Sequence, residues 1–433
     1  MIEPPTAGFA ASFAHRERAS HTLARGVSSS PRVTQRPVPL VIASASGARI
    51  IDVDGNRYID YSMGYGPLIL GHSPQVVMDA VQREMANGLR TGSVHRAESA
   101  LADRIASIVP SATISTFLSS GTEACQQAVR VARAATGRLR IVKFRYHYHG
   151  WSDGLHLASQ PGRDGPTTAG QDPEAIANVV VLDWGDANAL ERAMSSDIAA
   201  VIMEPAAINA GCFAPPEGFL EKARALTRAN EAILIFDEVI TGFRLALGGA
   251  QERYGVVPDM SVLGKALGAG LPISAITGSA AAMAPLVSGA VMHRGTYNGN
   301  PLSTAAAVAC VDYLATHAST LYPRIDRFAA TIAEHARSSA RRKGIAVAAN
   351  CVGPCVQLFG GVDAVPTLPD IVRTNAAQTL ALTEALVLQG IAPLPRGLMY
   401  VSAAHTDEDV DSTLTAIDAA FDALASKPPG REP

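Results

Sequence analysis

Lys265 and Asp237 are the two residues whose types and positions most strongly suggest chemistry. Asp237 follows the apolar run 232–236, and Lys265 lies in a glycine-rich turn after the apolar stretch 260–263. If these runs are neighbouring strands, the amine and the carboxylate meet at the strands' carboxyl ends. A lysine amine can hold an aldehyde as a Schiff base, and a carboxylate can keep a pyridine nitrogen protonated. The pair therefore predicts a pyridoxal 5′-phosphate site.

A phosphate site is predicted at the segment Ser119–Ala124, which reads Ser-Ser-Gly-Thr-Glu-Ala and follows the apolar run 114–118. Glycine lets a backbone approach an anion closely, and a helix N-terminus offers unpaired N–H groups. The same residues also fit simple N-capping of a helix, with Glu123 in the first turn. Lys265 and Asp237 favour phosphate binding over capping alone.

Further polar and aromatic residues follow other predicted strands. The segment 146–151 reads Tyr-His-Tyr-His-Gly-Trp, and one of its aromatic rings could stack on a flat cofactor. Asn209 could hydrogen-bond a phenolic oxygen, and Thr296 could reach a phosphate. Each is otherwise an ordinary loop residue, so their interpretation depends on the lysine and the aspartate.

The pattern of apolar runs predicts an α/β fold. Strands that alternate with helical segments indicate a mostly parallel sheet covered on both faces, with ligands at the carboxyl ends of the strands. A hairpin is expected over 49–60, around Asp54-Gly55. We expect four parts: an N-terminal segment with the hairpin over 1–60 that packs with the small domain, a large cofactor domain over 61–310, a small α+β domain over 311–425, and a disordered tail over 426–433.

Composition and motif spacing exclude several other classes. The net charge of −3 gives no reason to expect nucleic acid, and the weakly patterned residues before the hairpin do not suggest the DNA-binding domain of a cofactor-sensing regulator. The uncharged stretch 266–292 is broken by prolines and glycines, so we expect no membrane span. The five scattered cysteines indicate free thiols rather than a metal site, and we expect a cytoplasmic protein. Neither a phosphate-binding Gly-x-x-x-x-Gly-Lys-Ser/Thr loop nor a dinucleotide Gly-x-Gly-x-x-Gly motif fits around Lys265.

From about Gly47 to Asp411, the chain resembles class III aminotransferases, which are fold type I pyridoxal-phosphate enzymes, and within them the glutamate-1-semialdehyde aminomutase branch. The matching stretches are 52–60, 66–72, 120–124, 148–150, 236–244 and 299–301. The resemblance implies a homodimer with shared active sites, a seven-stranded sheet, Tyr148 stacked on the ring, and Thr296 at the neighbouring subunit's phosphate. The expected cofactor-binding residues are Ser120, Gly121, Thr122, Tyr148, His149, Asn209, Asp237, Val239, Lys265 and Thr296.

Departures from the aminomutase pattern bear on the substrate. The chain has Ser28-Ser-Ser-Pro-Arg32 where aminomutases have Asn-Ser-Pro-Val-Arg, and Tyr65 where they have a pocket tryptophan. It also has a Pro-Arg-Gly loop at Arg396, like related β-amino-acid aminotransferases, whose arginine binds a carboxylate. Arg396, Arg32 and Tyr65 are thus the predicted substrate-binding residues.

These departures favour an aminotransferase that moves an amino group between an amino acid, possibly a β-amino acid, and a 2-oxo acid in a ping-pong reaction. The alternative is an aminomutase that converts glutamate 1-semialdehyde to 5-aminolevulinate.

Overall fold

The computed structural model describes residues 8–161 and 163–426, which divide into two compact units. One unit contains the described residues up to Pro74 together with those from Pro323 onward. The other contains Gln75–Tyr322. The predicted tail lies, from residue 427 on, outside the described residues.

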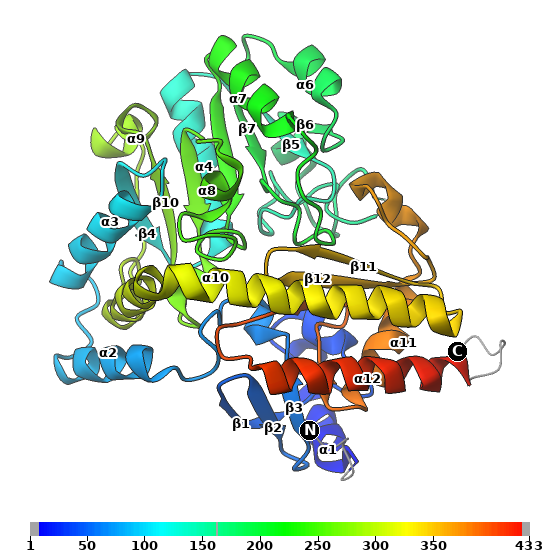
Figure 1. Ribbon diagram of the computed structural model, residues 1–433. Coiled ribbons are helices and arrows are strands. Elements are labelled where there is room, and N and C mark those ends of the chain that lie inside the picture. Colours follow the sequence, from blue (N-terminus) through cyan, green and yellow to red (C-terminus); the bar gives the residue numbers. More distant parts are fainter. Residues whose placement is uncertain (1–7, 162, 427–433) are drawn as a thin grey trace. The chain divides into compact units, whose positions relative to one another are not determined.

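A seven-stranded sheet forms the centre of the unit Gln75–Tyr322, as the resemblance implied (Figure 1). The strand order is β4-β10-β9-β8-β7-β5-β6; β10 is antiparallel to both neighbours, and the strands from β9 to β6 pair in parallel. The strands are β4 (Ile114–Leu118), β5 (Arg140–Phe144), β6 (Val179–Leu182), β7 (Ile198–Met203), β8 (Ile233–Glu238), β9 (Met260–Leu263) and β10 (Ser274–Gly278). The expected mostly parallel sheet of a fold type I enzyme is confirmed.

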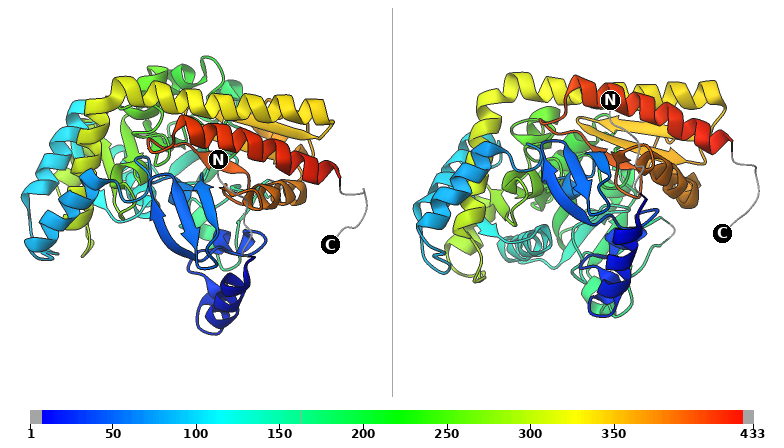
Figure 2. Two further views of the ribbon diagram at one scale, coloured as in Figure 1. Left: turned by 60° about the horizontal axis from the view of Figure 1, so that its bottom comes forward. Right: turned by 90° about the horizontal axis from the view of Figure 1, so that it is seen from below.

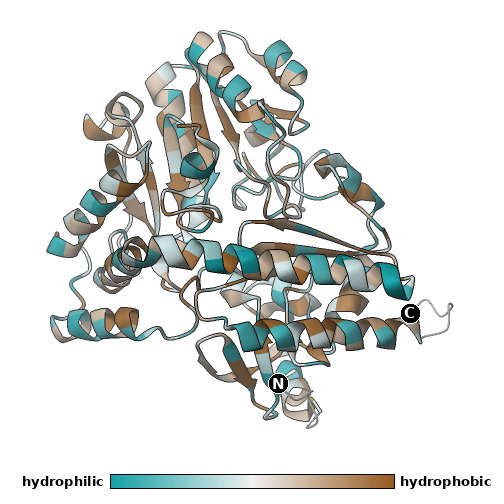
Figure 3. Cartoon of the chain, in the orientation of Figure 1, coloured by the Kyte–Doolittle hydropathy of each residue, from teal (hydrophilic) through white to brown (hydrophobic). Residues whose placement is uncertain are grey.

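Helices pack against this sheet because the central strands are apolar on both faces. Every residue of β7 is buried, and brown, hydrophobic colour dominates the strands in Figure 3. Buried residues of α4 and α9 join those of the strands in one hydrophobic core. The helices of this unit are α2 (Gln75–Ala86), α3 (Arg96–Ile108), α4 (Gly121–Thr136), α5 (Pro173–Ile176), α6 (Ala187–Ala193), α7 (Phe219–Ala229), α8 (Gly249–Tyr254), α9 (Ala280–Val287) and the first part of α10 (Pro301–Lys343).

The other unit contains two smaller sheets. The hairpin expected over 49–60 is present as β2 and β3, and the sheet runs β1-β2-β3-β13. Helix α1 lies beside the turn of this hairpin (Figure 2), where the Asp54 carboxylate accepts hydrogen bonds from the backbone N–H groups of Ala11 and Ser12. The elements are α1 (Ala10–Ser20), β1 (Ile42–Ser46), β2 (Arg49–Asp52), β3 (Arg57–Asp60) and β13 (Ile391–Ala392).

The remaining part of this unit is a three-stranded antiparallel sheet, β11-β12-β14, with helices α11 and α12. Helix α12 runs beside the last part of α10, where Arg327 pairs with Asp407 and Lys343 with Asp422 (Figure 2). The elements are β11 (Val347–Val352), β12 (Cys355–Gly360), α11 (Ala376–Val387), β14 (Leu398–Tyr400) and α12 (Asp407–Ala425). In the part of the chain that the structure describes, no helix is both long and apolar enough to cross a membrane.

Candidate active site

Asp237 and Lys265 lie at the carboxyl ends of two adjacent parallel strands, as the sequence predicted. Strand β8 pairs with β9 with Asp237 opposite Val262, and Lys265 follows β9 directly after Gly264. Lys265 begins a 3₁₀ turn with a positive φ of 42°. A positive φ is strained for a residue with a side chain, and such strain is concentrated at functional sites.

Three groups donate hydrogen bonds to the Asp237 carboxylate. Oδ2 accepts from His149 Nδ1 at 2.7 Å and from Cys125 Sγ at 3.3 Å, and Oδ1 accepts from the Val239 N–H at 3.1 Å. A carboxylate oxygen has two lone pairs, so both acceptor positions on Oδ2 are used and one on Oδ1 remains. Asp237 can therefore receive one further N–H, which is what a protonated pyridine nitrogen offers.

Both side-chain donors are held in the protonation state that this arrangement needs. Burial lowers the pKa of His149 although the Asp237 charge opposes it, so the imidazole is neutral and carries its proton on Nδ1. Burial and the Asp237 charge raise the pKa of the Cys125 thiol well above its usual value, so the sulfur keeps its proton. Ligand atoms of the three side chains lie within 4.8 Å of one another, close enough to hold a metal ion. The two hydrogen bonds to Oδ2 already account for this closeness.

The N-terminus of α4 forms a close-packed cradle of the kind that suits an anion. Ser120 caps the helix in a capping box with Glu123, and the N–H groups of Gly121 and Thr122 take no partner among the described residues. The chain packs tightly here: a Cβ on Gly150 would lie 2.5 Å from Thr122 Oγ1, and one on Gly121 would lie 3.1 Å from Val239 Cγ2. The cap is present, and it leaves the N–H groups of Gly121 and Thr122 available to an anion.

Tyr148 and Asn209 lie on different loops that follow β5 and β7. The Tyr148 side chain is 41% exposed, and its ring lies edge-on to His156 with 5.9 Å between centroids. Both residues are connected to Glu204, the residue after β7: Oε1 accepts from the Tyr148 N–H at 2.9 Å and Oε2 from the Asn209 N–H at 3.3 Å. Thr296 lies exposed in the turn that precedes α10.

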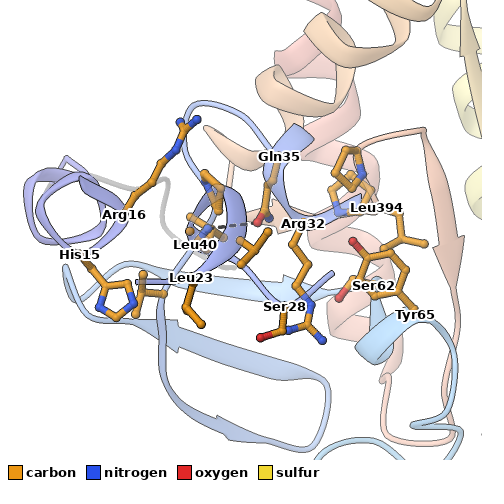
Figure 4. A pocket seen from close by; sticks show the side chains of 16 residues that line it. His15, Arg16, Leu23, Ser28, Arg32, Gln35, Leu40, Ser62, Tyr65 and Leu394 are labelled. Carbon is orange, nitrogen blue, oxygen red and sulfur yellow. Dashed lines mark hydrogen bonds between the residues drawn. The ribbon is translucent and has the colours of Figure 1, made fainter. Parts of the chain in front are cut away.

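The predicted substrate residues gather in the other unit. Tyr65, Arg32, Ser28, Ser62 and residues 393–395 contribute to the wall of a cavity of about 340 Å³, and Figure 4 shows Arg32 and Tyr65 adjacent on one side of it. Burial raises the pKa of the Tyr65 phenol, while the positive charges of Arg32 and Arg396 lower it. Both guanidinium groups therefore lie close enough to Tyr65 to affect its ionisation. Arg396 itself is exposed.

Sequence reasoning missed the roles of Cys125 and Glu204. Cys125 begins the second turn of α4, where its i+4 spacing places it on the same face as Gly121. Glu204 directly follows a fully buried strand, at the same edge of the sheet as Asp237 and Lys265. The rule that functional groups follow parallel strands could have identified Glu204.

Comparison with known proteins identifies the family. A model of the family "Aminotransferase class-III" matches residues 30–351. The chain belongs to this family. Curated relatives that are 36–39% identical over 92–95% of the chain are named glutamate-1-semialdehyde 2,1-aminomutase. One, from Sorangium cellulosum (strain So ce56), is 39% identical over 92% of this chain and 93% of its own length.

Two solved structures resemble this chain along nearly its whole length. An omega-transaminase from Sphaerobacter thermophilus is 30% identical, with a TM-score of 0.88 over 95% of this chain and 97% of that one. A β-phenylalanine aminotransferase from Variovorax paradoxus is 29% identical, with a TM-score of 0.86 over 96% and 94%. The class III family and the enzyme character expected from the sequence are confirmed.

The cofactor expected from the sequence, pyridoxal 5′-phosphate, is confirmed for this member of the class III family, and the described residues fit it. The free acceptor on Asp237 Oδ1 suits the ring nitrogen, and the N–H groups at the start of α4 suit the phosphate. Close contact at Gly121 and Gly150 leaves no room for side chains in the cradle. Each part of the cofactor therefore has a matching group in the structure.

Proposed function

We propose that the enzyme moves an amino group within glutamate 1-semialdehyde and is a glutamate-1-semialdehyde 2,1-aminomutase. The observation that carries this proposal is the 36–39% identity to proteins of that name, over nearly the full length of both chains. It favours the alternative from the sequence over the intermolecular transfer suggested by Arg396.

In this proposal, each side chain of the site has its own role. Bound pyridoxal phosphate supplies an electron-withdrawing ring that stabilises negative charge on the substrate carbon. Asp237 Oδ1 holds the proton of the ring nitrogen, and the Lys265 amine carries protons to and from the substrate. The N–H groups of Gly121 and Thr122 bind the phosphate, and Tyr148 stacks on the ring.

The remaining assignments complete this proposed site. Ser120 holds the start of α4 through its cap, Val239 fixes Asp237 through its N–H, and His149 orients Asp237. Asn209 faces the cofactor's phenolic oxygen. We also propose a cytoplasmic homodimer in which the exposed Thr296 reaches the phosphate site of the partner subunit.

The second candidate is an aminotransferase for amino acid and 2-oxo acid pairs, including β-amino acids. It is favoured by the two guanidinium groups that act on Tyr65, since Arg32 and Arg396 together could bind the carboxylates of a donor and an acceptor. Similarity to the omega-transaminase and the β-phenylalanine aminotransferase supports it as well.

Steady-state assays with and without an oxo acid distinguish the two candidates. We expect the holoenzyme to convert glutamate 1-semialdehyde to 5-aminolevulinate with no co-substrate. The competing outcome is turnover of an amino acid, such as a β-amino acid, that requires added pyruvate or 2-oxoglutarate and shows ping-pong kinetics. That result would replace the aminomutase assignment by the aminotransferase.

A further inference from the structure

Glu204 connects the two loops that carry Tyr148 and Asn209. These residues lie 61 positions apart in the chain (209 − 148), on loops that follow different strands, yet their backbone N–H groups donate to the two oxygens of this one carboxylate. Glu204 is 4% exposed, so water cannot replace these hydrogen bonds without entering the protein. One buried side chain therefore anchors both backbones.

A second contact connects Glu204 to the same loop. The Glu204 N–H donates to His147 Nδ1 at 3.0 Å, and the His147 side chain is fully buried. The residue is thus joined to the segment 147–148 both through its backbone and through its carboxylate. Such reciprocal bonds fix the direction of the loop more firmly than one bond would, because a rotation that keeps one bond breaks the other.

Lys143 holds the other side of this loop. Its fully buried ammonium donates to the carbonyl oxygens of His147 at 3.3 Å and Leu155 at 3.2 Å, and also to that of Leu157. Burial lowers the pKa of Lys143 to about 7, and the charge of Glu204 opposes this shift. Lys143 therefore holds this loop through three backbone carbonyl groups, and Glu204 holds it through the Tyr148 N–H.

We propose that Glu204 is a positioning residue of the active site, which sets the placement of Tyr148 and Asn209 against the cofactor by anchoring both backbones. This inference rests on the proposed roles of Tyr148 and Asn209. Glu204 acts through these two residues and does not itself need to touch the substrate.

The test is Glu204→Gln in the holoenzyme. An amide keeps one acceptor oxygen and places an NH₂ group against the second N–H, so one of the two anchored backbones is released. We expect the visible circular dichroism of the bound cofactor to change, because it reports the asymmetric surroundings of the ring. We also expect kcat to fall about tenfold or more, with a smaller effect on KM, since small misplacements near a reacting centre are costly.

Glu238→Gln is the matched control. Glu238 is also buried, ends the neighbouring strand, and accepts hydrogen bonds from Thr241 Oγ1, Gln251 Nε2 and the Ala250 N–H, none of which is assigned to the cofactor. The same substitution there should lower Tm and leave the cofactor's circular dichroism unchanged. Equal spectral changes in both variants, or a wild-type spectrum and kcat in Glu204→Gln, would overturn the proposal.

Lys143→Met keeps the inference testable if Glu204→Gln does not fold. It removes the three hydrogen bonds that Lys143 donates to the loop carrying Tyr148 and leaves both N–H bonds to Glu204 in place, so a weaker change of the same spectral kind is expected. An unchanged cofactor spectrum in a folded Lys143→Met variant would contradict the proposal. If the wild-type protein itself binds no pyridoxal phosphate, the proposed function fails, and this result is separate from any effect at Glu204.

Discussion

His149 Nδ1 lies 2.7 Å from Asp237 Oδ2, and both side chains are almost fully buried. A buried carboxylate is stable only when it is hydrogen-bonded or paired. The neutral imidazole supplies a short hydrogen bond without adding a charge that would compete with the ring nitrogen of the cofactor. His149 thereby fixes the orientation of Asp237 and leaves Oδ1 free to receive a further donor.

The first prediction concerns His149. We expect His149→Ala to lower kcat/KM about 10- to 100-fold, because a hydrogen bond to a charged group contributes about 1.5–3 kcal/mol. His317→Ala, at an exposed position on α10, should leave kcat/KM unchanged. Steady-state kinetics of the wild type, His149→Ala and His317→Ala measure the difference. A wild-type kcat/KM in His149→Ala would contradict a role for His149 in the active site.

The second prediction concerns the reactivity of Cys125. Because its pKa is raised well above the usual value, the thiol stays protonated at neutral pH, and only a thiolate reacts readily with alkylating reagents. Cys351, which is partly exposed, should be labelled by iodoacetamide at pH 7.5 well before Cys125. Peptide mass spectrometry of the holoenzyme follows both sites. Labelling of Cys125 as early as Cys351 would contradict the protonated, buried thiol.

The third prediction concerns stability and pH at Glu204. Burial and the Asp237 charge raise the pKa of Glu204 from 4.5 to about 7 in the folded protein. The folded state therefore binds this proton more tightly than the unfolded state. The stabilisation is fully present below pH 4.5 and is lost as the pH rises to 7.

A shift of this size corresponds to about 3 kcal/mol at most. Between pH 4.5 and pH 8, the free energy of unfolding should fall more in the wild type than in Glu204→Gln, whose side chain does not titrate. Denaturant unfolding at both pH values measures this double difference. Identical pH dependence in the two proteins would show that the Glu204 carboxyl does not titrate in this range.

The fourth prediction concerns the predicted substrate residues. Arg396→Ala should raise KM about 10- to 100-fold for substrates with a carboxylate, because it removes a charge-assisted hydrogen-bond donor. Amines without a carboxylate should be affected far less. Arg32→Ala tests the second guanidinium in the same way, and Arg373→Ala, an exposed arginine paired with Asp370, is the control. Equal effects on both substrate classes would make Arg396 an ordinary loop residue.

Parts of the fold could be predicted because they depend on local patterns. Strands β6, β7 and the first four residues of β8 are continuous apolar runs, which are typical of buried parallel strands. Asp237 and Lys265 could be placed together because the carboxyl ends of parallel strands share one edge of a sheet. The hairpin over 49–60 could be predicted because Asp54-Gly55 is a dipeptide that favours a tight turn between two strands.

Other parts could not be predicted because they depend on contacts between distant residues. Helix α1 has no clear apolar stripe, and its start is held by the Asp54 carboxylate, more than forty positions away. Cys125 looks like an ordinary core residue until its hydrogen bond to Asp237, 112 positions away, is seen. Glu204 shows its function only through the N–H groups of two separate loops.

The most direct test of the central claim is to reduce the holoenzyme with borohydride and locate the cofactor by peptide mass spectrometry. The chain has five lysines, of which Lys143 is also buried near the site, so the assignment is unambiguous. We predict loss of the visible absorbance and a mass increase of one reduced cofactor on the peptide that contains Lys265, and neither in Lys265→Ala. Attachment at Lys143 or another lysine, or near wild-type activity in Lys265→Ala, would contradict the account.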